Sequence, residues 1–394
     1  MSILVQKYGG SSVADVEKIG LVADKVVAAR RRGHDVVVVV SAMGKATDQL
    51  LALARQLSSD PPRRELDMLL TTGERVTMAL VSIAIAARGC EAISFTGSQS
   101  GILTNDRHFD ARIIEVRPHR IEDELSRGKV VIVAGYQGMS YRREITTLGR
   151  GGSDTTAVAL AAALGAERCE IYSDVDGVYS ADPKSVDDPV HLPVLDLAVL
   201  QEMAEAGAKV LNAQAVEWAR RSKITIHARR TSDPEDAAGR VPRETVARES
   251  ANAVAARAVV GLDKVVFARF SGEAERFIRA SSEAELPLLD LSIGTDGASA
   301  AIPLLNVPDF DARRRRLSVA LGESLSLVDA KALVSVVGDG LTTSAHAVPA
   351  FLRALASVGA LHSAITAGPL RIGAVIDAGK LSLAERALHA AFVR

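Results

Sequence analysis

The chain has 394 residues, 48% of them hydrophobic and 24% charged, which is the composition of a folded globular protein. A net charge of −1 provides no extended basic surface, so nucleic acid and membrane partners are not expected. No apolar run is long and uncharged enough to predict a transmembrane helix, and the opening segment lacks the pattern of a signal peptide. The length predicts two or three domains.

The first part of the chain alternates predicted strands and helices. Strands are expected at 3–8, 35–40, 92–95, 129–138, 169–179 and 224–230, and helices near 17–34, 63–88, 155–165 and 196–221. The five valines at 36–40 are typical of a strand that is buried on both faces. This alternation predicts an α/β fold whose parallel sheet is flanked by helices on both faces.

The composition changes near residue 233. The polar, Pro- and Gly-bearing stretch 233–254 predicts a linker between a domain at 1–232 and a C-terminal region at 255–394. Residues 332–394 indicate a small α+β domain, with elements in the order strand, helix, strand, strand, helix at 332–337, 346–358, 361–366, 370–376 and 381–391. The preceding unit, 255–325, is similar to it only weakly.

The two cysteines, Cys90 and Cys169, are far apart and have neither CxxC nor metal-ligand spacing. Their apolar surroundings predict buried, reduced thiols and hence a cytoplasmic protein. The eight histidines form no HxxxH-type pair, so no protein metal site is expected.

Two loops near the N-terminus carry groups suited to a phosphate. In KYGGSS, 7–12, Lys7 supplies a point charge, and Gly9 and Gly10 let backbone amides approach a ligand. In VSAMGKAT, 40–47, Ser41 and the amides that follow it stand where a helix begins. Neither is a Walker A loop, and the chain contains no GxGxxG. Taken alone, each is more simply an ordinary strand–loop–helix turn.

Two further stretches add charged groups. In TTGERV, 71–76, Glu74 is either a solvated helix residue or the partner of a ligand amine. In GRGGSD, 149–154, Arg150 can hold a carboxylate or phosphate through two hydrogen bonds, and Gly151 permits a positive-φ turn. Ser153 or Asp154 can alternatively be a plain helix N-cap, although a cap does not account for the arginine and the glycines.

The stretch YSDVDGVYSADPK, 172–184, follows another predicted strand and predicts a polar loop on the side of the sheet where α/β proteins bind ligands. The simpler alternative is a β-turn stabilised by Asx hydrogen bonds. Lys209 in GAKVLN is a further candidate cation. Because the carboxyl ends of parallel strands share one edge of a sheet, the loops after the strands at 3–8, 35–40, 129–134 and 169–173 are expected to converge. The combined groups suit phosphoryl transfer from a nucleotide to a small anionic acceptor.

Six consecutive motifs within residues 2–232 resemble those of the aspartate kinases of the amino-acid kinase superfamily. They are KYGGSSV, SAMGKAT, TTGERV, SFTGSQSGILT, TTLGRGGSDTTAVALAAALGA and CEIYSDVDGVYSADP. Residues 255–394 more loosely resemble the paired ACT regulatory domains of that family. The resemblance implies attack of the L-aspartate β-carboxylate on the γ-phosphate of ATP, which gives 4-phospho-L-aspartate and ADP, with Mg²⁺ carried by the ATP phosphates. A homo-oligomer is also expected, most simply a homodimer joined through the ACT-like domains, because such small domains usually bury their faces by pairing.

The resemblance assigns roles to the matching residues. Lys7 and Asp154 would be catalytic, with Lys7 stabilising the transferring phosphoryl group. Arg150 would bind the α-carboxylate of aspartate, Glu74 and Thr47 its amino group, and Gly152 and Ser153 would complete this site. The nucleotide would contact Lys7, Tyr8, Gly9, Gly10, Ser41, Ser173, Asp174, Tyr179, Asp182, Lys184 and Lys209.

Several stretches depart from the family pattern. Asn212-Ala213-Gln214 stands where His-Pro-Arg is usual. In the tail, VVFARFSGEAER lacks a Pro-Gly turn, LLDLSIG occupies the place of an effector-binding Gln-Asn pair, and LTTSAHAV and ITAGPLRIG replace Ser-His-Pro-Gly and STSEIRIS. These departures predict weak or no feedback inhibition by lysine and threonine.

Two other functions stay open on the sequence. One is another carboxylate kinase of the superfamily, such as a glutamate or acetylglutamate kinase, which the paired tail and TTGER disfavour. The other is a catalytically silent regulatory protein on the same scaffold. The joint presence of Lys7, Glu74, Arg150 and Asp154 argues against that alternative.

Overall fold

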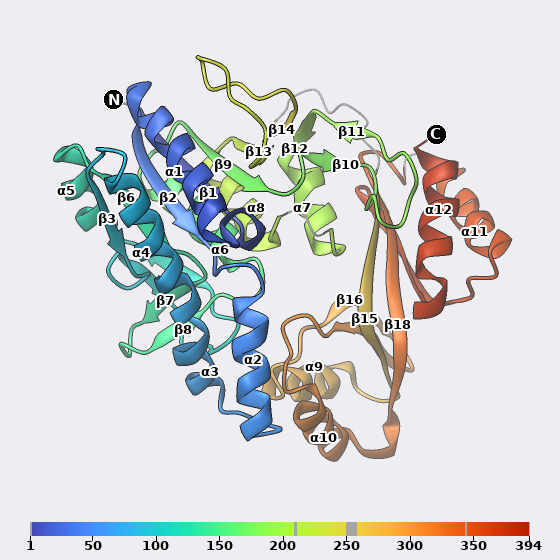
Figure 1. Ribbon diagram of the computed structural model, residues 1–394. Coiled ribbons are helices and arrows are strands. Elements are labelled where there is room, and N and C mark those ends of the chain that lie inside the picture. The colour runs from blue at the N-terminus through green and yellow to red at the C-terminus, as the bar shows by residue number, and fades with distance from the viewer. Residues whose placement is uncertain (1, 209–210, 250–257, 343–344, 394) are drawn as a thin grey trace. The chain divides into compact units, whose positions relative to one another are not determined.

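The computed structural model describes residues 2–208, 211–249, 258–342 and 345–393. The chain forms two compact units (Figure 1). The first unit comprises Met1–Val178, Leu192–Gln201 and Val210–Asn252, and the second comprises Tyr179–His191, Glu202–Lys209 and Ala253–Arg394. Each unit is therefore assembled from segments that are discontinuous in the sequence.

The first unit is built on an eight-stranded sheet with the order β12-β14-β13-β9-β1-β2-β6-β3. Neighbouring strands run parallel throughout, except for the antiparallel pair β13–β14. The predicted parallel α/β fold is thereby confirmed. The strands are β1 (Ile3–Tyr8), β2 (Asp35–Val40), β3 (Ala92–Phe95), β6 (Val130–Ala134), β9 (Arg168–Ser173), β12 (Val194–Asp196), β13 (Ile226–Arg230) and β14 (Glu244–Arg248).

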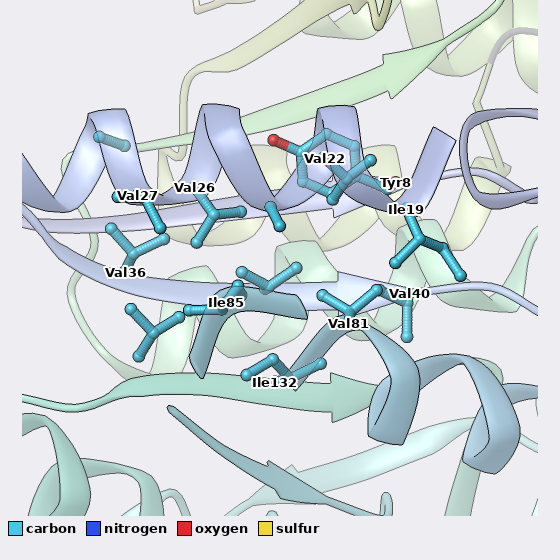
Figure 2. Packing of buried hydrophobic residues seen from close by; sticks show 14 of the residues in the cluster. Tyr8, Ile19, Val22, Val26, Val27, Val36, Val40, Val81, Ile85 and Ile132 are labelled. Carbon is cyan, nitrogen blue, oxygen red and sulfur yellow. The ribbon is translucent and has the colours of Figure 1, made fainter. Parts of the chain in front are cut away.

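The valines of β2 alternate between two apolar layers. Val36, Val38 and Val40 pack with α1 (Val16–Arg31) and α4 (Thr72–Ala86) in one buried cluster (Figure 2). Successive side chains of a strand point to opposite faces, so Val37 and Val39 are directed to the other layer, where α6 (Gly152–Ala163) lies against β1 and β2. Burial on both faces explains why a run of five valines is tolerated here.

The remaining elements of the first unit are shorter. The helices are α2 (Ala46–Leu57), α3 (Arg63–Leu70), α5 (His119–Ser126) and α8 (Ala213–Ser222), with a 3₁₀ turn at Gly10–Val13. A separate four-stranded sheet has the order β5-β4-β7-β8. Its strands are β4 (Ile102–Thr104), β5 (Ile113–Val116), β7 (Gln137–Ser140) and β8 (Ile145–Thr147). Helix α7 (Leu197–Glu205) and the short strands β10 (Val178–Tyr179) and β11 (His191–Leu192) contain residues of both units.

Four predicted elements are interrupted. The predicted helix 63–88 is α3 followed by α4, and the predicted helix 196–221 is α7 followed by α8, because Gly207 has φ 110° and Asn212 caps a new helix. The predicted strand 129–138 is β6 followed by β7, since Tyr136 takes φ 69°. The predicted strand 169–179 ends at Ser173 and resumes as β10.

The stretch predicted as a linker contributes to the first unit. β14 pairs with both β12 and β13, so residues 244–248 form a strand of the main sheet, in which Thr245 and Ala247 are buried. Glu235 accepts hydrogen bonds from Lys25 and Arg32 of the α1 region, at 3.5 and 2.8 Å. A polar composition suggested exposure, but here polar side chains are held by ion pairs.

The 24-residue stretch Arg63–Ala86 contains an 18-residue window with a mean hydropathy of 1.4, so by length and composition alone it could cross a membrane. In the structure they form α3 and α4, which carry the buried carboxylates of Asp67 and Glu74. Both carboxylates accept hydrogen bonds from other parts of the first unit. The stretch is therefore best explained as a pair of core helices.

The second unit contains two copies of one βαββα order. The first copy is β15 (Ala258–Phe270), α9 (Ala274–Glu283), β16 (Leu289–Gly294), β17 (Gly297–Pro303) and α10 (Phe310–Leu321). The second is β18 (Leu325–Val337), α11 (Ala347–Ser357), β19 (His362–Ala367), β20 (Arg371–Asp377) and α12 (Leu381–Phe392), in the order the sequence predicts. All six strands form one antiparallel sheet, β16-β17-β15-β18-β20-β19.

Both cysteines are free thiols, but only Cys169 is buried. Burial raises the pKa of Cys169 well above its ordinary value. Cys90 follows the turn after α4 and is only partly buried, so the expectation of two buried thiols was wrong for this residue.

Candidate functional site

The four loops predicted to converge do lie together. β9, β1, β2 and β6 are adjacent and parallel, so their carboxyl ends share one edge of the sheet. A cleft of about 230 Å³ opens there. Of the residues predicted to bind substrate or nucleotide, eight line it: Lys7, Gly10, Ser41, Thr47, Glu74, Arg150, Gly152 and Ser153.

Lys7 stands at the end of β1 and forms an ion pair with Asp154 of α6. Its Nζ lies 2.6 Å from Asp154 Oδ1, and the two side chains are 11% and 9% exposed. Removing two charges from water is costly, so such a pair is maintained only where its geometry is good. Asp154 thereby fixes the ammonium of Lys7 at the cleft without lining the cleft itself.

The glycine-rich loop ends in an unusual helix start. Gly151 is the N-cap of α6, with φ 77° and no side-chain capping hydrogen bond. The left-handed conformation favours glycine because a Cβ is strained there. Ser153 and Asp154 lie inside the first helical turn, so the alternative in which one of them is the cap was wrong.

Arg150 reaches the cleft from this loop. Its Nη2 donates to Oδ1 of Asp48 on α2 at 2.9 Å, and both side chains are 54% exposed. A half-exposed ion pair contributes at most about 1 kcal/mol, so a ligand carboxylate can compete for the guanidinium. Asp48 also lines the cleft, and nothing in the sequence distinguished it from an ordinary first-turn acid.

Glu74 is the most unusual ionisable group in the cleft. It is 3% exposed, and its Oε1 accepts from the amide of Ala42 at 3.0 Å. Its Oε2 has no hydrogen-bond partner among the described residues. Burial raises the pKa of Glu74 to about 7. A buried carboxylate oxygen without a partner, facing a cleft, is a candidate acceptor for a ligand ammonium.

Asp67, which the sequence analysis missed, shapes one wall of the cleft. It is fully buried and accepts from Thr147 Oγ1 at 2.6 Å and from the Phe109 amide at 3.1 Å, and His108 Nδ1 lies 2.6 Å away. These contacts hold Phe109, a cleft residue with φ 71°. The one available signal was an acid inside the apolar stripe of a predicted helix.

Two of the predicted nucleotide contacts, Tyr8 and Gly9, are not among the residues that line the cleft. The Tyr8 ring is fully buried and stacks on Tyr172 with 4.8 Å between centroids, within the α1 and α4 layer. The Gly9 amide donates to the Tyr172 carbonyl at 3.1 Å. The Tyr8 ring and the Gly9 amide therefore both have protein partners in this structure.

The other predicted nucleotide contacts are not among the cleft residues. Ser173 ends β9, and Asp174 is exposed in the loop after it. Tyr179, Asp182 and Lys184 belong to the second unit, where the Lys184 amide donates to Asp182 Oδ1 at 2.9 Å, as in the simpler Asx turn. Lys209 lies outside the described residues.

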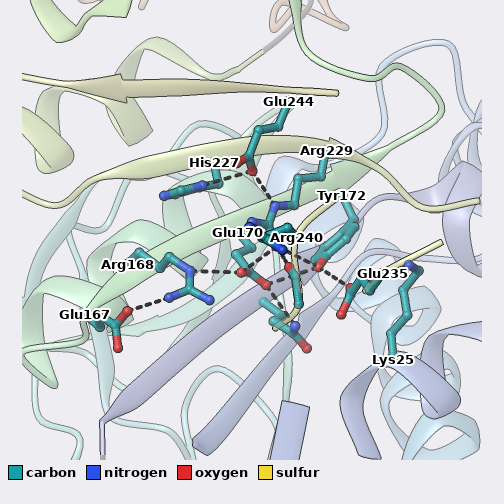
Figure 3. Close-up of polar contacts among 12 residues, drawn as sticks. Lys25, Glu167, Arg168, Glu170, Tyr172, His227, Arg229, Glu235, Arg240 and Glu244 are labelled. Atoms are coloured by element: carbon teal, nitrogen blue, oxygen red, sulfur yellow. Dashed lines mark hydrogen bonds and ion pairs between the residues drawn. The ribbon is translucent and has the colours of Figure 1, made fainter. Parts of the chain in front are cut away.

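The face of β1 opposite Lys7 carries a buried charge network (Figure 3). Glu170 accepts from Gln6 Nε2 at 2.9 Å, from Arg229 Nη1 at 2.7 Å and from the Tyr172 hydroxyl at 3.1 Å. Arg229 also donates to Glu244 at 2.6 Å. Burial alone would raise the pKa of Glu170, but the adjacent Arg229 and Arg168 bring it below its usual value. The network ties β1, β9, β13 and β14 together.

No group of three or more His, Cys, Asp and Glu side chains that could hold a metal occurs within residues 2–208, 211–249, 258–342 and 345–393. The charged groups at the cleft are instead suited to anions and to an ammonium. Lys7, Lys45 and Arg150 are its cations, and Asp48 and Glu74 its acids.

Comparison with known proteins agrees with this geometry. Residues 2–229 match the amino acid kinase family. The aspartokinase of Mycolicibacterium smegmatis is 43% identical, and that of Corynebacterium glutamicum 42%, each over 100% of this chain and 96% of the relative. The crystal structure of E. coli aspartokinase III with aspartate and ADP, 22% identical, has the same fold, with a TM-score of 0.85 over 100% of both chains. The chain therefore belongs to the amino acid kinase family and, within it, to the aspartokinases.

Proposed function

We propose that this protein transfers the γ-phosphate of ATP to the β-carboxylate of L-aspartate, giving 4-phospho-L-aspartate and ADP. The observation that carries the proposal is the presence of Lys7, Glu74 and Arg150 around one cleft at the carboxyl edge of the sheet. A substrate with two carboxylates and one ammonium complements two cations and a buried acid.

The amino-acid end of the substrate is held by three groups. Arg150 exchanges Asp48 for the α-carboxylate, and the unpartnered Oε2 of Glu74 accepts from the ammonium, with Thr47 beside it. Gly152 and Ser153 form the neighbouring wall. The β-carboxylate is then directed towards Lys7.

The reaction needs no covalent enzyme intermediate. A β-carboxylate oxygen, already ionised at neutral pH, forms a bond to the γ-phosphorus while the bond from that phosphorus to the β–γ bridging oxygen breaks, and ADP leaves. Lys7, held by Asp154, stabilises the charge on the transferring group, and Gly10 and Ser41 stand beside it. Catalysis thus consists of positioning and electrostatics.

The groups at the cleft are suited to the phosphates of ATP rather than to direct binding of Mg²⁺. Asp154 is engaged by Lys7, and the described residues offer no carboxylate cluster, so Mg²⁺ would be bound mainly by the ATP phosphates. When bound, the ion would neutralise part of the negative charge of the phosphates. The proposed nucleotide contacts remain Lys7, Gly10, Ser41, the backbone of Tyr8 and Gly9, Ser173, Asp174, Tyr179, Asp182, Lys184 and Lys209.

Two ACT-like domains at 255–394 remain our proposal, which the two βαββα copies support. The catalytic domain proposed at 1–232 is extended by β14, which lies in the stretch 233–254 predicted as a linker and pairs in its sheet. We propose that these copies join two chains into a homodimer in the cytoplasm. Feedback inhibition by lysine or threonine is proposed to be weak or absent, because LLDLSIG and LTTSAHAV lack the expected effector-binding groups.

A coupled ADP-release assay with L-aspartate, L-glutamate and no acceptor tests the proposed reaction. The expected result is ADP release that depends on aspartate. Release that depends on glutamate instead would indicate another carboxylate kinase, and no release with any acceptor would indicate a silent scaffold.

The feedback prediction is tested in the same assay at fixed aspartate and ATP. Millimolar lysine, threonine or both are expected to leave most of the activity. Strong inhibition by either amino acid would contradict this prediction and would show that the second unit binds effectors through other residues.

A further inference from the structure

The side chain of Asn212 connects two elements of the first unit. Its Oδ1 accepts from the Gln214 amide at 2.8 Å and thereby caps the N-terminus of α8. Its Nδ2 donates to the backbone carbonyl of Arg150 at 2.8 Å. The two ends of one amide thus serve a helix cap and the glycine-rich loop at the same time.

The loop also packs directly on this residue. A Cβ placed on Gly151 would lie 2.9 Å from Asn212 Cβ, so the backbone approaches as closely as glycine allows. Thr155 Oγ1, in α6, donates to Asn212 Oδ1 at 3.3 Å. Asn212 therefore contacts the loop before α6 and α6 itself.

A glycine-rich loop needs such a constraint. Gly149 and Gly151 take φ 75° and 77°, and Gly152 follows them, so the backbone on both sides of Arg150 has few intrinsic restrictions. The Arg150 side chain is half-exposed and reaches across to α2, so it does not by itself define the backbone beneath it. Because the carbonyl of residue 150 is fixed, the loop has fewer conformations, and less conformational entropy is lost when the guanidinium is placed for binding.

We propose that Asn212 is a positioning residue for the acidic substrate: it holds the backbone of Arg150 so that the guanidinium faces the cleft before the substrate binds. This inference rests on the proposed role of Arg150 as the carboxylate-binding group. Asn212 acts through the loop and has no contact with the reacting atoms.

The chemistry of asparagine gives a selective variant. Asn212→Asp keeps an oxygen acceptor for the α8 cap but loses the N–H donor and places a carboxylate beside the Arg150 carbonyl. Aspartate caps helices as well as asparagine does, so the melting temperature is expected to stay within a few degrees. The KM for aspartate is expected to rise by about 5- to 30-fold, while kcat and the KM for ATP stay within about twofold.

Two further variants keep the test decisive. Asn212→Ser also keeps a cap, but its shorter side chain removes the amide group that reaches the Arg150 carbonyl, and it replaces Asn212→Asp if that protein does not fold. Asp15→Ala removes the side-chain cap of α1, where Asp15 accepts from the Lys18 amide at 2.8 Å, and is the control for cap loss alone. It is expected to lower the melting temperature without changing the KM for aspartate.

A double-mutant cycle with Arg150→Ala separates this inference from the function on which it rests. If Asn212 acts through Arg150, Asn212→Asp adds no further increase in KM once Arg150 is alanine. A wild-type KM in Asn212→Asp, full additivity in the cycle, or an equal loss in both substrates would overturn the inference. An Arg150→Ala protein with an unchanged KM for aspartate would overturn the assignment of Arg150 and this inference with it.

Discussion

The buried polar groups on the two faces of β1 differ in how fully their hydrogen bonds are made. Gln6 and Tyr8 point into a layer where Glu170, Tyr172 and Arg229 bond to one another (Figure 3). Lys7 points to the cleft, where Glu74 has a carboxylate oxygen that lacks a hydrogen-bond partner among the described residues, and where the ion pair between Arg150 and Asp48 is half-exposed.

The two faces thus separate polar groups that stabilise the fold from polar groups that remain available to a ligand. A buried network with its hydrogen bonds made costs little and fixes the strands in register. A buried carboxylate with an unmade bond destabilises the free protein, and a ligand that supplies the bond recovers that free energy. Substitutions on the two faces should therefore separate activity from stability.

The largest effect is expected for Lys7→Ala. Removal of the charge that stabilises the transferring phosphoryl group should lower kcat by about 10²- to 10³-fold, with a smaller change in the KM for aspartate. Steady-state kinetics check this result. Lys18→Ala, which removes an exposed lysine from α1, is the control. Near wild-type turnover in Lys7→Ala would show that the active site has been misassigned.

On the other face, Arg229→Met should leave kcat of the folded protein unchanged and lower the free energy of unfolding. Breaking a buried ion pair while one charge stays buried costs about 3 kcal/mol or more. Urea unfolding measures the loss, and the double variant Arg229→Met with Glu170→Gln should regain part of it, because the buried carboxylate charge that has lost one of its two arginines is gone. If Arg229→Met lowered kcat as much as Lys7→Ala does, at unchanged stability, the assignment of one face to stability and the other to activity would be wrong.

Glu74→Gln should weaken aspartate binding and stabilise the folded protein at high pH. The pKa of Glu74 is raised from an ordinary 4.5 to about 7, so the folded state binds the proton more tightly than the unfolded state. Its ionisation therefore costs stability increasingly as pH rises from about 4.5 to 7, up to about 3 kcal/mol. Glu74→Gln should be more stable than the wild type at pH 8, nearly equal to it at pH 5, and weaker in aspartate binding.

Urea unfolding at the two pH values, together with the KM for aspartate, checks this prediction. In the wild type, the same ionisation should make the KM for aspartate rise as pH falls below about 7. A Glu74→Gln protein that is destabilised at pH 8 would mean that the carboxylate has a stabilising partner after all.

The smallest effect is expected for Asp48→Asn. The variant removes a half-exposed competitor for Arg150, so the KM for aspartate should fall by about two- to threefold and stability should change by less than about 1 kcal/mol. Kinetics at low and high salt measure the change. An increase in KM of several fold would instead make Asp48 a substrate contact.

The sequence predicted the parts of the molecule that depend on local pattern. The five valines of β2, the order of elements from β18 to α12 and the edge of the sheet where Lys7, Glu74 and Arg150 meet are confirmed. The same local patterns carried no sign that β14 joins the main sheet, since its pairing with β12 and β13 is a tertiary event. They also gave no sign that Asn212 reaches the Arg150 carbonyl, a contact between residues 62 positions apart.

All of these variants depend on the proposal that the protein phosphorylates the β-carboxylate of L-aspartate in the cleft. The most direct test is trapping of the acyl phosphate with hydroxylamine, with ATP, Mg²⁺ and L-aspartate supplied to the full chain. The proposed function predicts an aspartyl β-hydroxamate that forms with the wild type and with Lys18→Ala, and is reduced about 10²-fold or more with Lys7→Ala. No hydroxamate from the wild type, or equal amounts from the wild type and Lys7→Ala, would contradict it.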